Sequence, residues 1–297
     1  PSFLIYRNGL IKSIEKFKMY AGQLRTLVEK DEFSYASTYS NFIQAFRDRG
    51  QKRWDSDLLR YYYKVEWPLK TKLTNTLQTD DGKSIVTETN YTYNTKDLIQ
   101  STTYNVDNTQ IIEKVKYPFD FSDSVNSALT AKNIIGTPVE SITLKNNIVT
   151  QATKTEYFNN FGLYLPRTIY KTEFDTTVAE ANYASYYKPV MSFDHYNNKG
   201  KLLQFKNVNG PSTYYVWGYN DQYPIAKLEN FSAIDATGIQ SIITEAVNAS
   251  NKDASPALEN ALRTALANLR DAAPNAMVTT YTYDPLIGVT SITDPKG

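Results

Sequence analysis

The feature that most constrains the fold is a short phrase that recurs along the chain. It consists of an aromatic residue, then Asn or Asp, then a short turn that usually ends in Gly, then apolar residues. Copies lie at residues 91–99 (without the Gly), 157–163, 196–202 and 281–289. Asn and Gly tolerate the positive φ angles of hairpin turns, and aromatic and β-branched residues favour strands. Because internal repeats mark a modular architecture, we expect each copy to form the turn of a β-hairpin.

Composition indicates a folded β protein. Of the 297 residues, 41% are hydrophobic and 13% aromatic, which is enough for a sizeable core in one large β domain or in two domains. Tyrosine is the unusual residue, with 24 copies. Its ring and hydroxyl suit half-buried sheet faces, which is the interpretation we favour. The alternative is an exposed aromatic surface that binds sugars or adheres to a partner.

Charge and cysteine content exclude several function classes. Lys and Arg number 32 and Asp and Glu number 31, for a net charge of +1, so there is no basic field to recruit nucleic acid. The basic segment 47–53 contains an acidic residue and is expected to be a solvated loop. The absence of cysteine excludes disulfides, thiolate nucleophiles and Cys-ligated metal sites. No apolar stretch approaches the ~20 residues of a membrane span.

Motifs that carry enzyme chemistry are mostly missing. The one histidine, His195, lies inside a copy of the phrase, where a sheet residue before the turn is a better interpretation than a general base or a metal ligand. The sequence contains no Gly-x-Ser-x-Gly nucleophile motif and no glycine-rich phosphate loop. We therefore predict no catalytic residues, no cofactor and no metal. Paired carboxylates for glycoside hydrolysis need no fixed local spacing, so a polysaccharide-cleaving enzyme stays open as a third alternative.

The N-terminal part has the weakest pattern. Residues 8–35 mix helical spacing with the alternation of Phe33 and Tyr35, and we favour a hairpin there. Residues 37–57 show no sustained period, which predicts a long loop or irregular insertion with a short helix near 42–47. The chain opens with Pro1, without an initiator Met or a signal peptide, so we expect a fragment of a longer protein.

From residue 59 onward the β pattern is strong, with one short helix or helical turn predicted at 122–132. The exception is 232–273, where alanine dominates and aromatics are absent. Apolar residues at helical spacing predict two antiparallel helices there, the second beginning at Ser255-Pro256. We expect them to bury their apolar faces against the sheet, covering an edge or an open end. A separate hairpin that binds a partner is the alternative.

These patterns divide the chain into four parts. Residues 1–58 are predicted to form an N-terminal hairpin plus an irregular loop, and 59–231 a repetitive β region. Residues 232–275 form the inserted helical hairpin, and 276–297 begin further repeats.

Two segments carry a family resemblance. Residues 215–227 read Tyr-Val-Trp-Gly-Tyr-Asn-Asp-Gln-Tyr-Pro-Ile-Ala-Lys, and residues 279–297 read Thr-Thr-Tyr-Thr-Tyr-Asp-Pro-Leu-Ile-Gly-Val-Thr-Ser-Ile-Thr-Asp-Pro-Lys-Gly. Together with the repeated phrase, they resemble the YD-repeat (Rhs-type) proteins of Bacteroidetes over residues 59–297. The Trp-Gly-Tyr-Asn segment is the most specific part of this resemblance.

The resemblance implies a mainly β fold in which antiparallel β-hairpin repeats form a curved sheet or shell, here with an inserted helical hairpin. In relatives the shell encloses a C-terminal variable region, often a toxin. This chain departs from the pattern, since its copies are irregularly spaced, residues 232–273 interrupt them, and neither a self-cleaving Asp pair nor a toxin is visible. The residues expected to build the repeats are Tyr157, Asn159, Gly162, Tyr196, Asn197, Gly200, Trp217, Gly218, Tyr219, Tyr283, Asp284 and Gly288.

The functional hypothesis is a structural, non-enzymatic shell segment of a large exported protein that encloses or presents a C-terminal toxin or effector. The resemblance implies a secreted or cell-surface location, outside the outer membrane. It also implies the remainder of the polypeptide as partner, together with the type 9 secretion machinery or cell-surface proteins. The alternative is a surface adhesin or glycan-binding module that uses exposed Tyr and Trp rings.

Overall fold

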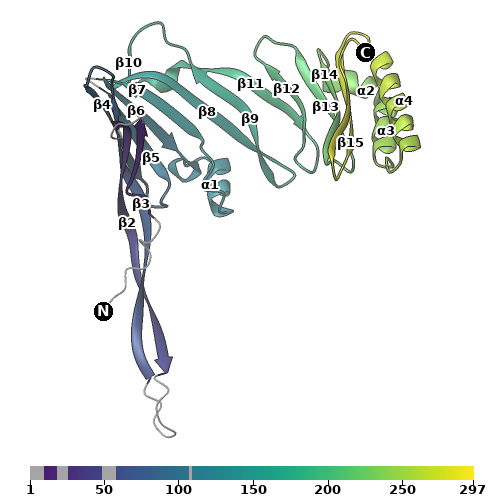
Figure 1. Cartoon of the computed structure of the whole chain (residues 1–297). Coiled ribbons are helices and arrows are strands. Elements are labelled where there is room, and N and C mark those ends of the chain that lie inside the picture. The colour runs from purple at the N-terminus through teal and green to yellow at the C-terminus, as the bar shows by residue number, and fades with distance from the viewer. Residues whose placement is uncertain (1–9, 19–25, 49–57, 107–108) are drawn as a thin grey trace. The chain divides into compact units, whose positions relative to one another are not determined.

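The computed structural model describes residues 10–18, 26–48, 58–106 and 109–297 and is mainly β (Figure 1). Its 16 described strands form one antiparallel sheet. Strands that follow one another in sequence are neighbours in the sheet, from β1 to β9 and from β11 to β16. β9 lies next to β11, and the short β10 pairs with β8 outside this order. The prediction of a mainly β fold of consecutive antiparallel hairpins with inserted helices is confirmed.

The strands are β1 (Ser13–Lys18), β2 (Thr26–Asp48), β3 (Leu58–Gln78), β4 (Ser84–Tyr93), β5 (Ile99–Val106), β6 (Thr109–Lys116), β7 (Glu140–Lys145), β8 (Ile148–Asn160), β9 (Leu163–Thr172), β10 (Val178–Ala179), β11 (Tyr187–Tyr196), β12 (Leu202–Asn207), β13 (Ser212–Gly218), β14 (Tyr223–Glu229), β15 (Met277–Asp284) and β16 (Gly288–Thr293). The helices are α1 (Ser124–Ala131), α2 (Ala233–Gly238), α3 (Gln240–Ser250) and α4 (Pro256–Ala272), with short 3₁₀ turns η2 (Pro118–Asp120) and η3 (Tyr183–Tyr186). The short helix predicted at 122–132 corresponds to α1.

The chain divides into two compact units. Unit 1 comprises residues 1–116, 141–152 and 174–183, and unit 2 comprises residues 117–140, 153–173 and 184–297.

Within unit 1, β2 and β3 form a long two-stranded arm (Figure 1). They pair from Glu29 opposite Leu77 to Asp48 opposite Leu58. On the outer edges, β1 pairs with β2 only as far as Glu32, and β4 pairs with β3 only from Lys72 onward. We call residues 34–48 of β2 and 58–71 of β3 the arm, because no other described strand pairs with them.

The arm corrects one prediction. Residues 37–48 belong to strand β2, not to a loop or a short helix. Register shifts between Ser34 and Tyr35 and between Ser37 and Ser40 interrupt the two-residue alternation, so the strand has no clean local period. The pairing partner lies in β3 and is invisible to a local pattern. Residues 49–57, the rest of the predicted loop and of the basic segment 47–53, lie outside the described residues.

The hairpin favoured for residues 8–35 corresponds to the antiparallel pair β1 and β2. The backbone N–H of Phe33 also donates to the carbonyl of Lys12, which extends this edge by one step. Residues 19–25, which interrupt the pattern in the sequence, lie outside the described residues.

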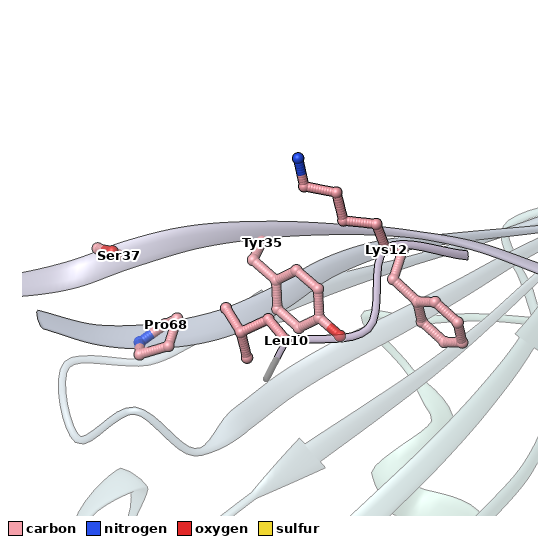
Figure 2. Close-up of a pocket in the computed structure, with 6 residues that line it drawn as sticks. Leu10, Lys12, Tyr35, Ser37 and Pro68 are labelled. Atoms are coloured by element: carbon pink, nitrogen blue, oxygen red, sulfur yellow. The ribbon is translucent and has the colours of Figure 1, made fainter. Parts of the chain in front are cut away.

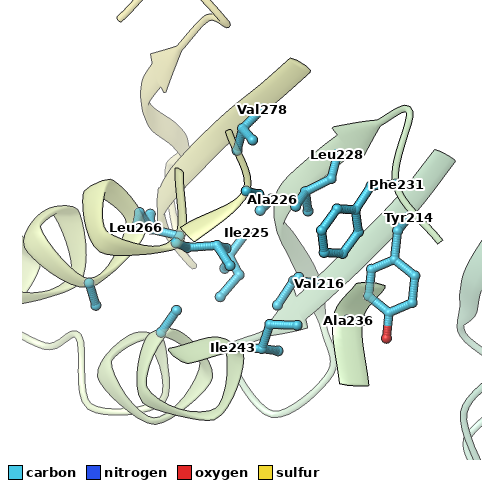
Figure 3. Packing of buried hydrophobic residues seen from close by; sticks show 14 of the residues in the cluster. Tyr214, Val216, Ile225, Ala226, Leu228, Phe231, Ala236, Ile243, Leu266 and Val278 are labelled. Atoms are coloured by element: carbon cyan, nitrogen blue, oxygen red, sulfur yellow. The ribbon is translucent and has the colours of Figure 1, made fainter. Parts of the chain in front are cut away.

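Within unit 2, the hydrophobic core lies between one face of β13–β15 and the helices α2–α4 (Figure 3). Register shows why a face is covered: Tyr214 lies opposite Leu228, which lies opposite Val278, so the three side chains share one side of the sheet. Figure 3 shows Ile243 and Leu266 of the helices close to this side. The helices therefore cover a face, where an edge or open end was expected.

The helical segment contains three helices where two were predicted. Ser232 and Asp235 form a reciprocal capping box at the N-terminus of the six-residue α2. At its C-terminus, Ile239 leaves helical geometry at φ −121° and ψ 26° before α3 begins. The start predicted for the last helix is confirmed: Ser255 caps α4 by accepting from the Leu258 N–H, and Pro256 is its first residue.

Candidate functional site: latched hairpin turns

The repeated phrase forms a hydrogen-bonded turn. Between β11 and β12, the Asn197 carbonyl accepts from the Gly200 N–H at 3.0 Å. The Asn197 side-chain oxygen Oδ1 accepts from the N–H groups of Lys199 and Lys201, at 3.0 and 2.9 Å. Gly200 has φ +78°, a conformation that favours glycine. The Asn therefore closes the turn with its backbone and its side chain together.

The copy without glycine folds in the same way. The Asn94 carbonyl accepts from the Asp97 N–H at 3.1 Å, and the Asn94 side-chain Oδ1 accepts from the N–H groups of Lys96 and Leu98. Asp97 takes the positive φ, at +58°. Asp tolerates this region better than most residues, which explains why the phrase survives the loss of Gly.

The other predicted turn residues also lie in turns. The Asp284 carbonyl accepts from the Ile287 N–H at 3.0 Å, and Asp284 Oδ1 accepts from the Leu286 N–H at 2.9 Å. Gly288 follows at φ +124°. The β8–β9 copy is tighter, with Phe161 and Gly162 at φ +51° and +85°. There the Gly162 N–H donates to Asn159 Oδ1 at 2.8 Å.

The aromatic residue of the phrase has a role that the sequence does not reveal. Its hydroxyl donates to a backbone carbonyl of an earlier segment, a contact that we call a tyrosine latch. The four latches are Tyr93 to Lys70 (2.7 Å), Tyr157 to Pro138 (3.5 Å), Tyr196 to Pro166 (2.7 Å) and Tyr283 to Pro224 (2.9 Å). Each tyrosine lies at a register shift of its hairpin.

Two latches end on prolines that lie within strands of the sheet. Pro166 and Pro224 lie within paired strands, opposite Tyr157 and Trp217, and both positions are β-bulges. Proline has no N–H for the ladder and is tolerated in a sheet at a bulge. The bulge disturbs the ladder, and the next tyrosine supplies the donor for the proline carbonyl. Each latch thus joins one hairpin to the one before it.

Burial widens the pH range over which the latch hydroxyls stay protonated. It raises the pKa of Tyr196 to about 12, and it raises the pKa values of Tyr157 and Tyr283 above 10 as well. At neutral pH these groups therefore remain hydrogen-bond donors.

The Trp217–Tyr219 segment connects the sheet to the helices. A Cβ at Gly218 would overlap the Ser250 hydroxyl and lie 2.7 Å from Cγ2 of Ile225, so only glycine allows the end of α3 to approach β13 this closely. Ser250 Oγ accepts from the Tyr219 N–H at 3.2 Å. The Trp217 indole is half-buried and donates to the Leu202 carbonyl at 2.8 Å.

Tyr219 is the centre of a polar and aromatic junction. Its hydroxyl donates to Asp253 at 2.7 Å, in the α3–α4 loop, and accepts from the Tyr283 N–H at 3.0 Å. Its ring meets those of Tyr223 and Tyr283 edge-on, at centroid distances of 5.9 and 5.6 Å. Burial raises its pKa above 10. One side chain therefore ties together a turn, a helix connection and the last hairpin.

Two hollows among the described residues are lined in part by polar side chains. The first, of about 200 Å³, lies at the base of the arm, where Leu10 lies beside the Tyr35 ring and the Lys12 amine points away (Figure 2). The second, of about 340 Å³, is lined by Asp253, Glu259 and Asp284. All three carboxylates already accept hydrogen bonds from the protein.

Residues with other chemistry do not gather. His195 is exposed in β11. In the part of the chain that the structure describes, no group of three or more His, Asp or Glu residues could hold a metal ion. None of the described helices is long and apolar enough to cross a membrane. Sequence reasoning missed Ser250, Asp253 and the latch prolines, although proline inside a predicted strand was an available signal for a bulge.

Comparisons with known proteins show a weak structural likeness and no match in sequence families. No protein-family model matches the chain, and no curated protein matches it. Among solved structures, a chain of the Photorhabdus luminescens Tc holotoxin pore, in a variant of its TccC3 component, is similar over 95% of this chain, with 9% identity and a TM-score of 0.27. The matched region spans 18% of that chain.

Proposed function

We propose that this chain is a structural, non-enzymatic wall segment of a large β-hairpin shell of the YD/Rhs type. One observation carries the proposal: the residues of the repeated phrase are used in turns and latches. Asn197 and Gly200 close one hairpin, and Tyr196 joins it to the hairpin before it. A ladder of hairpins joined in this way can extend strand by strand, as a wall requires.

One carboxylate of the second hollow, Glu259, favours the same role. A general acid for glycoside hydrolysis needs a raised carboxyl pKa. Hydrogen bonds from Arg263, Thr282 and Thr290 instead lower the pKa of Glu259. Glu259 thus links α4 to the β15–β16 hairpin by accepting hydrogen bonds from Thr282 and Thr290, in keeping with a non-enzymatic role.

The remaining parts of the proposal rest on the sequence resemblance. They are an exported, secreted or cell-surface location, a C-terminal toxin or effector held by the shell, and passage by type 9 secretion in a bacterium of the Bacteroidetes. The partner would be the remainder of the same polypeptide, or cell-surface proteins.

Electron microscopy of the protein expressed from its complete gene tests the proposal. We expect β4–β16 to continue into further hairpins around a hollow, and a C-terminal region that resists protease until the wall is opened. A sheet that ends within this chain, with both faces in contact with bulk solvent, would refute the wall role.

A glycan-binding or adhesive module is the second candidate, favoured by the arm. Trp67 and Tyr62 are 62% and 54% exposed, whereas Trp217 is engaged with Leu202 and Lys201. An indole ring exposed to the degree of Trp67 presents a face for sugar stacking. A glycan array with the purified chain separates the candidates: binding that Trp67→Ala abolishes and Trp217→Phe preserves would favour the adhesin.

A further inference from the structure

The turn between β12 and β13 contains an asparagine that is directly followed by glycine. Asn209 is exposed, has φ +63°, and precedes Gly210. Its carboxamide makes no hydrogen bond to the described part of the chain. In the β11–β12 turn, by contrast, Asn197 Oδ1 accepts from two backbone N–H groups, and Asn197 Nδ2 donates to Asp221 at 3.2 Å. The Asn209 carboxamide is therefore free to turn towards its own main chain.

The turn between β7 and β8 supplies a matched asparagine. Asn147 is also exposed, has φ +65°, and makes no side-chain hydrogen bond within the described ranges. The next residue is Ile148, whose branched side chain crowds its own backbone nitrogen. Gly210 has no side chain that could crowd its nitrogen. The two asparagines thus differ mainly in access to the peptide nitrogen that follows them.

An uncrowded peptide nitrogen beside a free carboxamide can form a cyclic imide. Base removes the Gly210 amide proton, the nitrogen attacks Cγ of Asn209, and the carboxamide nitrogen leaves as ammonia. Water then opens the imide at either of its carbonyl groups, which gives aspartate or isoaspartate at position 209. The net change consumes water and releases ammonia, without an oxidant or a reductant. Asparagine is among the thermolabile residues of proteins.

One hydrogen bond of the turn opposes the reaction and is lost through it. The Gly210 N–H donates to the Asn207 carbonyl at 2.9 Å, so the turn must open before the nitrogen attacks. Isoaspartate adds a carbon atom to the main chain inside this turn. There is little room for it, since a Cβ on Gly210 would lie 3.3 Å from both the carbonyl oxygen and Cβ of Asn207. The turn with isoaspartate therefore cannot close in the same way.

The strands that flank this turn are bonded to the start of the helical segment. Lys206 and Ser212 form the last pair of β12 and β13 before the turn. The Ser212 carbonyl accepts from the Phe231 N–H at 3.1 Å. Gln204 Oε1 of β12 accepts from the N–H of Ala233, the first residue of α2, at 2.6 Å. A turn that opens is therefore expected to loosen α2 as well.

We propose that Asn209 is a self-modifying site, which converts to isoaspartate and aspartate through an imide with the Gly210 nitrogen. The isoaspartate form has a looser β12–β13 turn and a looser contact between β12 and α2. Asn147 stays an amide over the same period, because Ile148 hinders the attack.

Peptide mapping of the purified chain by mass spectrometry, with fragmentation that separates isoaspartate from aspartate, tests the chemistry. At pH 8 we expect Asn209 to convert at least about tenfold faster than Asn147, with both products present, and more slowly at pH 6. The other Asn-Gly pair, at residues 8 and 9, lies outside the described residues and is read from a separate peptide. Equal rates at the two asparagines, or aspartate as the sole product, would overturn the imide route.

Two variants move the reaction in opposite directions. Asn209→Gln should stop it at this position, because glutamine would have to close a larger ring. Ile148→Gly should create a second site by raising the conversion of Asn147 to within a few-fold of that of Asn209. Unchanged conversion of Asn147 in Ile148→Gly would contradict the role of the following residue.

Hydrogen exchange of the separated isoaspartate form tests the structural consequence. We expect the ends of β12 and β13 and the start of α2 to exchange faster than in the unmodified chain, with β8 and β9 unchanged. Asn209→Asp is the control, since it adds the charge without the extra backbone carbon and should exchange like the unmodified chain. Unchanged exchange in the isoaspartate form would refute the loosened turn. Equal acceleration in Asn209→Asp would refute the added carbon as its cause.

Discussion

The arm of unit 1 and the helix-covered strands of unit 2 are both antiparallel β-strands, but they differ in how much of their side-chain surface is buried. In unit 2, Leu228 of β14 and Leu262 of α4 are fully buried. In the arm, Ile43, Tyr62 and Trp67 are each more than half exposed. An isolated two-stranded ribbon is marginal in water. Strand formation in this chain therefore follows from backbone pairing, whereas local stability follows from what covers the strand.

The difference extends along the first part of unit 1. Among the side chains that the structure describes between residues 10 and 116, the buried ones are Thr89 and Thr102, and no hydrophobic one is buried. Cross-strand polar pairs take their place, such as Lys72 with Glu88 at 2.6 Å. Exposed ion pairs contribute ~0–1 kcal/mol each, so we expect this part to open locally at lower free energy than β13–β15.

The largest expected effect comes from the covered region. Leu228→Ala removes a fully buried side chain between the sheet and the helices and should lower the free energy of unfolding of that region by about 3 kcal/mol. Trp67→Ala in the arm should change stability by less than about 0.5 kcal/mol, because its side chain is 62% exposed. Urea unfolding followed by peptide-resolved hydrogen exchange measures both. Equal losses at the two sites would break the comparison.

Gly218→Ala tests the closest approach between sheet and helices. The added methyl group overlaps Ser250, so α3 must move away from β13, at a cost of about 2 kcal/mol. Gly136→Ala is the matched control, since nothing lies within 4 Å of its Cβ position and its φ is not in the left-handed region. Thermal unfolding monitored by the helical circular dichroism signal measures the loss. Adding Ser250→Gly should restore part of it, and an unrestored double variant would contradict the overlap as its cause.

Removing one latch should have a smaller, local effect. Tyr196→Phe leaves the ring in place and deletes the donor to the Pro166 carbonyl, which should cost about 1 kcal/mol. Hydrogen exchange in β9 and β11 should accelerate accordingly, with no change in the arm. Tyr281→Phe serves as the control, because the Tyr281 hydroxyl makes no hydrogen bond to the part of the chain that the structure describes. If both variants exchange alike, the latch does not join the hairpins.

The turns could be predicted from the sequence because their chemistry is local. Asn197 and Gly200 bond to each other within one turn, and Asp284 bonds within its own turn. The copy without Gly forms the same turn because Asp97 adopts a positive φ. The start of the last helix at Ser255 was likewise encoded by adjacent residues.

The features that the sequence did not predict depend on distant partners. β2 continues as a strand because β3 pairs with it across register shifts that disguise the alternation. Gly218 was recognised as a repeat residue, but its reason, the approach of Ser250, lies 32 positions away. The latches join Tyr196 to Pro166 across 30 positions, and a carbonyl acceptor leaves no trace in side-chain identity.

The smallest expected effect is the acid dependence of the covered region. Hydrogen bonds from Arg263, then from Thr282 and Thr290, lower the pKa of Glu259 in the folded protein below its ordinary value of 4.5. A lowered folded-state pKa means that the stabilisation is complete above pH 4.5 and is lost as pH falls through the folded-state value. Unfolding of the covered region should therefore become easier below that pH, and Glu259→Gln should reduce this dependence.

Glu245→Gln, on an exposed position of α3, is the control for the acid experiment and should retain the dependence of the unmodified chain. Peptide-resolved exchange between pH 3 and pH 6, corrected for intrinsic rates, would measure β15, β16 and α4, the elements that Glu259 joins through Thr282 and Thr290. The arm lacks this contact, so Glu259→Gln should leave its exchange unchanged. If the arm responded to Glu259→Gln as strongly as α4, the two regions would not differ in what holds them.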